Sequence, residues 1–140
     1  MTSEVIVDGD MIVFQPQFGN RLVTLLMPAM IRGSGHALIN KKKVCIKGDE
    51  GKLKFDAMYT TSSHTIPGKG TVTIQQLDPS NLSSVCHSDA VVITLGNNKF
   101  TACFTPSTPA MTPPPASSPD PAVPSYGKGE FMASQKLVFA

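Results

Sequence analysis

The sequence predicts a mainly β fold of short strands and hairpins, with an extended proline-rich segment near the C-terminus. Three observations lead to this prediction. Helical periodicity is almost absent, short apolar runs alternate with turn-forming residues, and eight of the 12 prolines lie between Pro106 and Pro124. The chain has 140 residues and 41% apolar content, so it is long enough for one domain and can bury a core.

The N-terminal part begins with a candidate hairpin. Residues 4–7 and 11–14 are apolar runs, and the Asp-Gly-Asp sequence at 8–10 between them is typical of a turn. Residues 22–31 are the only stretch that resembles a buried helical turn, and Pro28 limits its length.

A second hairpin is predicted around the lysine run. Residues 37–39 and 44–46 are its strands, and we take 41–42 as its two-residue loop. In this register, His36 and Cys45 point to the same face of the hairpin.

Three Gly-x-Gly sequences, at 33–35, 68–70 and 127–129, each precede a strand-like segment. This weak repeat indicates a stack of similar β units, since none of the three leads into a helix as a phosphate-binding loop would. Another strand pair is expected at 90–95 and 99–104.

The proline distribution divides the chain into three parts. Residues 1–105 form the expected β body, and residues 106–125 form an extended segment that cannot take part regularly in a β ladder. Residues 126–140 contain strand-forming sequence again and are predicted to include a closing strand. We therefore expect the proline-rich segment to run along the body and return to it.

Composition excludes several classes of protein. The net charge of +2, with dispersed basic residues, does not favour nucleic-acid binding. The longest apolar stretch has ten residues, well below the roughly 20 that a membrane-spanning helix needs. The N-terminus has acidic residues where a secretory signal would have basic ones, so no signal peptide is expected. Three cysteines without a CxxC pair indicate free thiols and assembly in a reducing compartment.

No catalytic signature is present, and we predict that the protein is not an enzyme. A small zinc hydrolase is the least favoured alternative. It would need an open metal position and a general base, for which Asp49 and Asp89 are the only candidates.

The histidines and cysteines suggest a structural metal site. Each histidine lies at the edge of a predicted strand unit, and equivalent edges of stacked β units converge in space. Three imidazoles and one thiolate make a closed tetrahedral zinc site. Cys45 competes with Cys86 for the fourth position, whereas Cys103 is expected to be a buried strand thiol. The predicted ligands are His36, His64, Cys86 and His87.

Part of the chain resembles a known family. The sequence GSGHALIN at 33–40, followed by KVCIKGD at 43–49, resembles the repeat unit of the PAAR-repeat proteins, and HTIPGKGTVTI at 64–74 is similar to the next unit. These proteins are spike tips of type VI secretion systems and related contractile injection systems. The Pro-Ala-Ala-Arg sequence itself is replaced here by Lys-Val-Cys-Ile.

The resemblance implies a small conical stack of β-hairpins with a metal, usually zinc and alternatively iron, near its vertex. It also implies a structural role: capping a trimeric β-helical spike protein, VgrG-like or phage-spike-like, and sharpening it for membrane puncturing. A secreted effector is a further implied partner, and the target membrane would be contacted transiently. Assembly in the cytoplasm and delivery outward on the injection apparatus would explain the missing signal peptide.

A different class of function competes with this one. A generic β-sandwich or barrel binding module would carry the proline-rich segment as a tether and the histidines as surface residues. One bound metal per chain and a trimeric spike partner would separate the spike tip from such a module.

Overall fold

The computed structural model describes residues 4–87, 90–115 and 117–135, without the side chains of residues 84–87. Strands make up 51% of the chain and short helical turns 6%, which confirms the mainly β prediction. The elements in chain order are β1 (Met11–Phe14), β2 (Gln17–Phe18), β3 (Arg21–Leu25), β4 (Ala29–Met30), β5 (Leu38–Ile39), β6 (Lys42–Lys43), η1 (Asp49–Lys52), β7 (Phe55–Thr61), β8 (Gly68–Gln76), η2 (Pro79–Asn81), β9 (Leu82–His87), β10 (Val91–Ile93), β11 (Phe100–Thr108) and β12 (Ser125–Met132).

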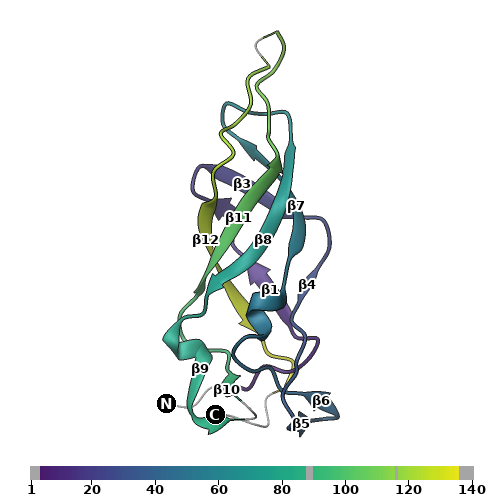
Figure 1. Ribbon diagram of the computed structural model, residues 1–140, viewed down its shortest axis with the longest axis vertical. Coiled ribbons are helices and arrows are strands. Elements are labelled where there is room, and N and C mark those ends of the chain that lie inside the picture. The colour runs from purple at the N-terminus through teal and green to yellow at the C-terminus, as the bar shows by residue number, and fades with distance from the viewer. Residues whose placement is uncertain (1–3, 88–89, 116, 136–140) are drawn as a thin grey trace.

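One eight-stranded antiparallel sheet forms most of the molecule, with the order β2-β3-β7-β8-β11-β12-β1-β4. The sheet curls into a half-barrel, so that β2, at one edge of the sheet, lies beside β12. A Cβ atom on Gly127 of β12 would lie 2.9 Å from the ring of Phe18 in β2, so the two strands approach closely there. The described part of the molecule is elongated: β5, β6, β9 and β10 lie at one end, and residues 109–115 and 117–124 project at the other (Figure 1).

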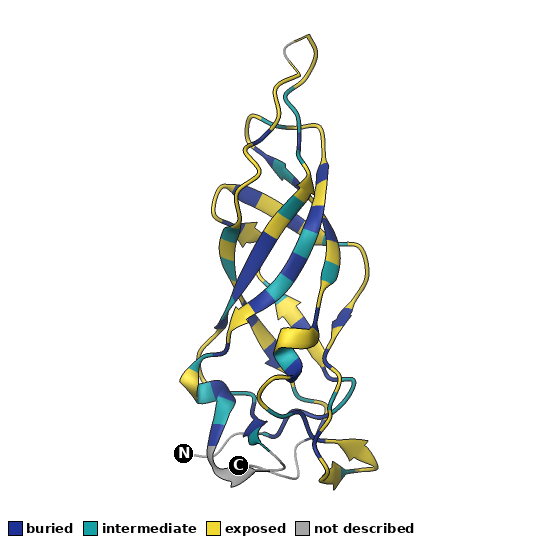
Figure 2. Ribbon diagram, viewed as in Figure 1, coloured by how far each residue is buried: buried dark blue, intermediate teal, exposed yellow. Residues whose placement is uncertain are grey.

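The core lies on the inner face of the curled sheet. Buried and exposed positions alternate along its strands (Figure 2), as expected for a sheet with one solvated face. Aromatic rings fill the interior: Tyr59 and Phe104 lie 4.9 Å apart between ring centroids, and Phe100 and Phe131 lie 5.1 Å apart.

Two of the three Gly-x-Gly sequences serve this aromatic packing. A Cβ atom on Gly70 of β8 would lie 2.4 Å from the ring of Phe104, and one on Gly129 of β12 would lie 2.8 Å from the ring of Phe100. Only glycine leaves room for these rings. The sequences at 68–70 and 127–129 are therefore parts of strands, and they do not mark a repeated β unit as predicted.

Several predicted pairings are wrong because long-range partners replace local ones. β1 pairs with β12 and β4, so no hairpin joins residues 4–7 to residues 11–14. β11 pairs with β8 and β12 rather than with residues 90–95. Residues 22–31 contain strand sequence from β3 and β4, with no helical turn.

The lysine hairpin exists, but its register differs from the prediction. Ile39 pairs with Lys42, and the loop residues Asn40 and Lys41 have φ values of 50° and 68°. Both values fit a type I′ turn, for which Asn is favoured. Cys45 is fully buried whereas His36 is exposed, so the two side chains do not share a face as expected.

The proline-rich segment takes a different path from the expected one. β11 continues through Pro106 to Thr108, and β12 begins at Ser125. Residues 109–115 and 117–124, which we call the tip segment, project beyond the sheet, and the returning part binds Arg21 of β3 through Asp120, Pro121 and Val123 (Figure 1). None of the described helices is long and apolar enough to span a membrane.

Candidate functional site

Three short segments at the end opposite the tip segment form a closed triangle. Residues 4–8, 43–47 and 91–95 each pair with both of the others, and we call them the base triangle. The antiparallel bridges are Val7 with Val44, Ile46 with Val92, and Val5 with Thr94.

The backbone hydrogen bonds of the base triangle run in a cycle. At its centre, the N–H of Ile6 donates to the carbonyl oxygen of Ile93 (3.0 Å), that of Ile93 to Cys45 (2.8 Å), and that of Cys45 to Ile6 (2.9 Å). A second cycle surrounds the first. Its donor–acceptor pairs are Asp8 to Lys43 (2.8 Å), Lys47 to Val91 (2.7 Å) and Leu95 to Glu4 (2.8 Å). One chain thus builds a pseudo-threefold arrangement of strands.

The turns that leave the three segments follow the same symmetry. Gly9, Gly48 and Gly96 occupy equivalent positions and have φ values of 87°, 109° and 75°, in the left-handed region that favours glycine. The next residues are Asp10, Asp49 and Asn97.

The two aspartates play the same role in the first two turns. Asp10 accepts a hydrogen bond from the N–H of Val7, and Asp49 accepts one from the N–H of Ile46, both at 2.9 Å. In the third segment the equivalent N–H, that of Thr94, donates to the carbonyl oxygen of Asn81 instead. The three units are therefore nearly equivalent, but the third turn, at Gly96, differs from the other two.

This repeat has a signal in the sequence that differs from the Gly-x-Gly pattern. The sequences VIVDGD at 5–10, VCIKGD at 44–49 and VITLGN at 92–97 share a β-branched start, a glycine and a final Asp or Asn. The sequence-based prediction assigns all three to separate hairpins or strand pairs, because it identifies the Gly-x-Gly sequences as the repeat. Aligning the chain on Gly followed by Asp or Asn would have found all three.

The valines and the central side chains of the base triangle are buried. Val5, Val7, Val44 and Val92 form a second apolar cluster separate from the main core, with Ile46 packed against it. On the central cycle, Ile6, Cys45 and Ile93 are fully buried and belong to the main core. Burial, with a smaller contribution from the charges of Asp49 and Asp10, raises the pKa of Cys45 well above its usual value.

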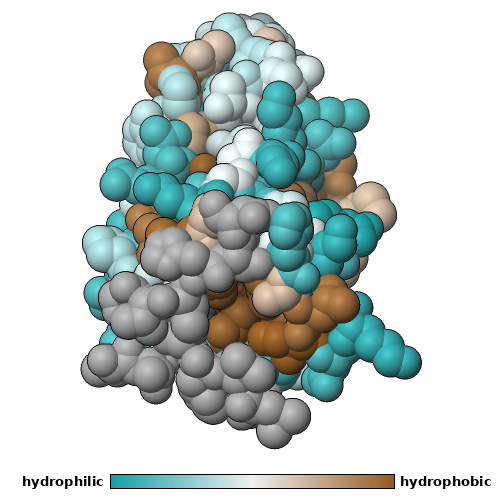
Figure 3. All heavy atoms as spheres, turned by 60° about the horizontal axis from the view of Figure 1, so that its bottom comes forward, coloured by the Kyte–Doolittle hydropathy of each residue, from teal (hydrophilic) through white to brown (hydrophobic). Residues whose placement is uncertain are grey.

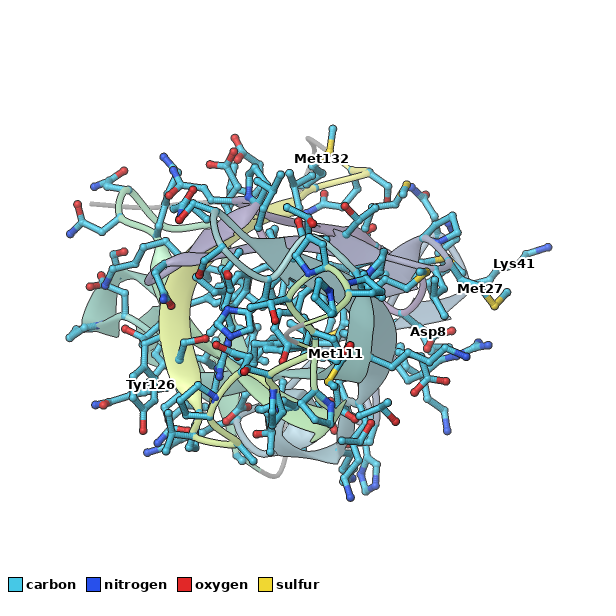
Figure 4. All side chains as sticks on the ribbon, turned by 90° about the horizontal axis from the view of Figure 1, so that it is seen from above. Asp8, Met27, Lys41, Met111, Tyr126 and Met132 are labelled. Atoms are coloured by element: carbon cyan, nitrogen blue, oxygen red, sulfur yellow. The ribbon has the colours of Figure 1, made fainter. Side chains whose placement is uncertain are left out.

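The tip segment forms an antiparallel loop that folds back on itself. Met111 bridges both Ile66 in the β7–β8 connection and Pro119 on the returning side. The N–H of Thr112 donates to the carbonyl oxygen of Ser118, and Thr112 Oγ1 accepts from the N–H of Ser118 (2.7 Å). Seen along the long axis, Met111 lies near the middle of the molecule, whereas Lys41, Tyr126 and Met132 lie at its periphery (Figure 4).

A buried ion pair fixes the tip segment to the sheet. Asp120 Oδ2 accepts hydrogen bonds from Arg21 Nε (3.0 Å) and Nη2 (2.8 Å) and from the hydroxyl of Tyr59 (3.0 Å). The side chains of Arg21 and Asp120 are only 3% and 4% exposed. The same Tyr59 hydroxyl accepts from the N–H of Ala110 (2.9 Å), so both sides of the tip segment meet at this pair.

Arg21 uses all five of its N–H donors here. Besides its two bonds to Asp120, it donates to the carbonyl oxygens of Pro121 and Val123 and to Ser125 Oγ. Its guanidinium carbon also lies 5.2 Å from the ring centre of Tyr59. A buried charge with every donor satisfied gives a stiff joint between the sheet and the tip segment.

The two ends differ in surface charge. Asp120 is the only charged residue between Lys99 and Lys128, and it is buried against Arg21. At the base, the exposed β5–β6 hairpin carries three consecutive lysines, 41–43. Figure 3, which brings the base forward, shows apolar side chains exposed among polar ones there.

The predicted metal ligands are distributed over both ends. His36 is exposed in the β4–β5 connection, where the N–H of the preceding Gly35 bonds to Val44 of the base triangle. Cys86 and His87 belong to β9, which pairs with β10 at the base, but their side chains lie outside the described residues. His64 lies in the β7–β8 connection beside the tip segment, with Nδ1 2.9 Å from Thr61 Oγ1 and 3.9 Å from Asp120 Oδ1.

The structure therefore places His36 beside the base triangle and His64 beside the tip segment. Within the part of the chain that the structure describes, no three His, Cys, Asp or Glu side chains are grouped to hold a metal ion. The four-ligand site stays a prediction, and no step of the function proposed below depends on it.

Fold and site together define an elongated structural β protein with a pseudo-threefold base and a narrow, anchored tip. Comparison with protein families identifies it further. The model of the contractile injection system spike tip protein family matches residues 1–140, so the chain belongs to that family. A comparison with curated proteins found no match.

Proposed function

We propose that the chain caps the end of a trimeric spike, with the base triangle facing the spike and the tip segment pointing outward. The single observation that carries this proposal is the cyclic hydrogen bonding of residues 4–8, 43–47 and 91–95. A trimer presents three identical surfaces around its axis. A single chain matches them only if it repeats one arrangement three times, as the base triangle does.

The opposite end supports the outward orientation. When the spike is driven into a target, its leading end must resist bending. It must also cross a lipid bilayer, whose interior disfavours charged side chains. The joint between Arg21 and Asp120 supplies stiffness, because tilting the tip segment would break hydrogen bonds to a buried guanidinium. The tip segment carries no unpaired charge, and a charged side chain at the centre of a bilayer costs about 2.5–3.5 kcal/mol or more.

This role places the protein in the cytoplasm during assembly and outside the producing cell after firing. The injection system would be of the type VI or a related contractile kind. A secreted effector carried near the tip and brief contact with the target membrane follow from the same proposal. No catalytic step is required of the chain.

Photo-crosslinking tests the orientation. A photo-reactive amino acid at Lys41, in the exposed hairpin at the base, should crosslink to the trimeric spike protein of the same injection system. The same amino acid at Ser118, in the tip segment, should not. Native mass spectrometry should show one copy of this chain for each trimer. Crosslinking from Ser118 alone, or a ratio of three chains per trimer, would contradict the proposal.

A structural zinc or iron ion remains a separate proposal. Elemental analysis of the purified chain tests it: one equivalent of metal supports the proposal, and none rejects it. His36→Ala and His64→Ala then report whether either histidine takes part, because only the loss of a ligand lowers the metal content.

A further inference from the structure

Three methionines lie side by side on the outer face of the sheet. Met11 in β1 pairs with Met132 in β12 on one side and with Met30 in β4 on the other. Directly paired residues share a face of a sheet, so these side chains form one continuous row across three strands. They are 43%, 54% and 44% exposed, and we call them the methionine row.

Apolar exposure continues beyond the row. Met27, in the connection between β3 and β4, is 76% exposed and is the most exposed large apolar side chain among the described residues. Met11 and Met27 both line a groove of about 550 Å³ that also reaches core side chains such as Phe18 and Val72. Clustered exposed apolar side chains mark interaction surfaces, and methionine adapts its shape to a partner better than branched side chains do.

The methionine row is continuous with the base triangle. Asp10, at the turn of the first triangle segment, directly precedes Met11. Its carbonyl oxygen accepts from the N–H of Ile31, the residue after Met30. Its carboxylate accepts from the N–H and hydroxyl of Ser134, two residues beyond Met132. All three methionines therefore lie next to residues that are linked to Asp10, through its backbone or its buried carboxylate, at the first turn of the base triangle.

The methionine row lies next to only one of the three turns of the base triangle. In the pseudo-threefold repeat, the position of Met11 corresponds to Glu50 in the second unit and Asn98 in the third, and both are polar. The fold does not require an apolar residue at this position, because the other two units form the same turn without one. Folding alone therefore does not account for the exposed row.

We propose that the spike contact extends from the base triangle over the methionine row, so that one protomer of the trimer meets a larger, apolar surface than the other two. This inference rests on the proposed function and adds to it: the cap binds off-centre, on the side of β12, β1 and β4. Apolar side chains near the rim of the spike are the chemistry that fits this surface.

Methyl NMR tests the contact without altering the chain. Protein with ¹³C-labelled methionine methyl groups is titrated with the trimeric spike protein of the same injection system. The signals of Met11, Met30 and Met132 should shift or broaden, whereas those of Met58 and Met111 should not. Shifts that depend on the concentration of the labelled chain alone would overturn the proposal, because the row would then serve self-association.

A pair of variants gives a second readout. The double variant Met30→Glu and Met132→Glu should weaken spike binding about tenfold or more, because two charges would be desolvated in the contact. Tyr126→Glu is the matched control, since Tyr126 is 56% exposed on the same β12 and lies on another side of the molecule (Figure 4). Its affinity should be unchanged, and circular dichroism should show both variants folded.

The outcomes separate the inference from the proposed function. If the unaltered chain binds the spike and the double variant binds equally well, the methionine row is not part of the contact, while the capping role stands. If the unaltered chain does not bind the spike at all, the capping role and this inference both fail. Equal weakening by Tyr126→Glu would also reject the inference, since the effect would not be specific to the row.

Discussion

The base and the tip of this protein are stabilised in different ways. The base triangle has two cycles of backbone hydrogen bonds and its own cluster of buried valines. The tip segment has few buried side chains and depends on one arginine that binds both an aspartate and three further oxygen atoms. A wide end can repeat one unit and bury apolar side chains, whereas a narrow end has too few residues for a core.

This difference has a mechanical meaning. Many weak, equivalent interactions at the base tolerate the loss of any one of them. The tip segment lacks such redundancy, because its attachment to the sheet depends mainly on the hydrogen bonds of Arg21. The two ends should therefore respond very differently to single substitutions.

The largest effect is expected at Asp120. Asp120→Ala leaves the guanidinium of Arg21 buried without its counter-charge, which should lower the free energy of unfolding by about 3–5 kcal/mol. Chemical denaturation measures this change. Asp56→Ala is the matched control, because Asp56 is exposed on β7, and it should change stability by less than about 0.5 kcal/mol. Similar losses in both variants would show that Asp120 is not a special joint.

A smaller and graded effect is expected at the three turns of the base. Gly9→Ala and Gly48→Ala should each cost about 1–2 kcal/mol, because a Cβ atom strains the left-handed backbone although the space around it is open. Gly96→Ala should cost more. Its Cβ would also lie 2.7 Å from both Asn81 Nδ2 and Ser80 Oγ. Equal costs at all three positions in thermal unfolding would mean that the third corner is not distinct.

The sequence predicted the fold class and the family but not the arrangement of the two ends. Local signals predicted the lysine hairpin, whose strands are adjacent in the chain, but not its register. They failed for residues 4–7 and 90–95, because these pair with each other across most of the sequence length. Arg21 and Asp120 gave no motif, since their contact depends on how β3 and the tip segment meet in space. The predicted metal site treats the histidines as equivalent edges of similar units, whereas His36 lies at the base and His64 lies beside the tip segment.

An alkaline titration probes the joint between the sheet and the tip segment. Burial, followed by the neighbouring carboxylate of Asp120, raises the pKa of Tyr59. The folded state therefore holds the phenolic proton more tightly than the unfolded state. Stability should be unaffected by this group below about pH 10, the value for an unfolded tyrosine, and should fall as pH rises above it. In denaturation series at several pH values, Tyr59→Phe should show a shallower decline, and an unchanged decline would contradict this assignment.

The smallest effects on folding are expected from one exposed position at each end. Val123 in the tip segment and Leu38 in β5 are 58% and 60% exposed, so Val123→Lys and Leu38→Lys should each change stability by less than about 0.5 kcal/mol. Their functional effects should be opposite. Val123→Lys should leave spike binding intact and lower the pressure at which the protein still inserts into a lipid monolayer, because it adds a charge to a neutral tip. Leu38→Lys should weaken spike binding and leave monolayer insertion unchanged. If the two variants behave alike in both assays, the division of the molecule into a docking end and a leading end is wrong.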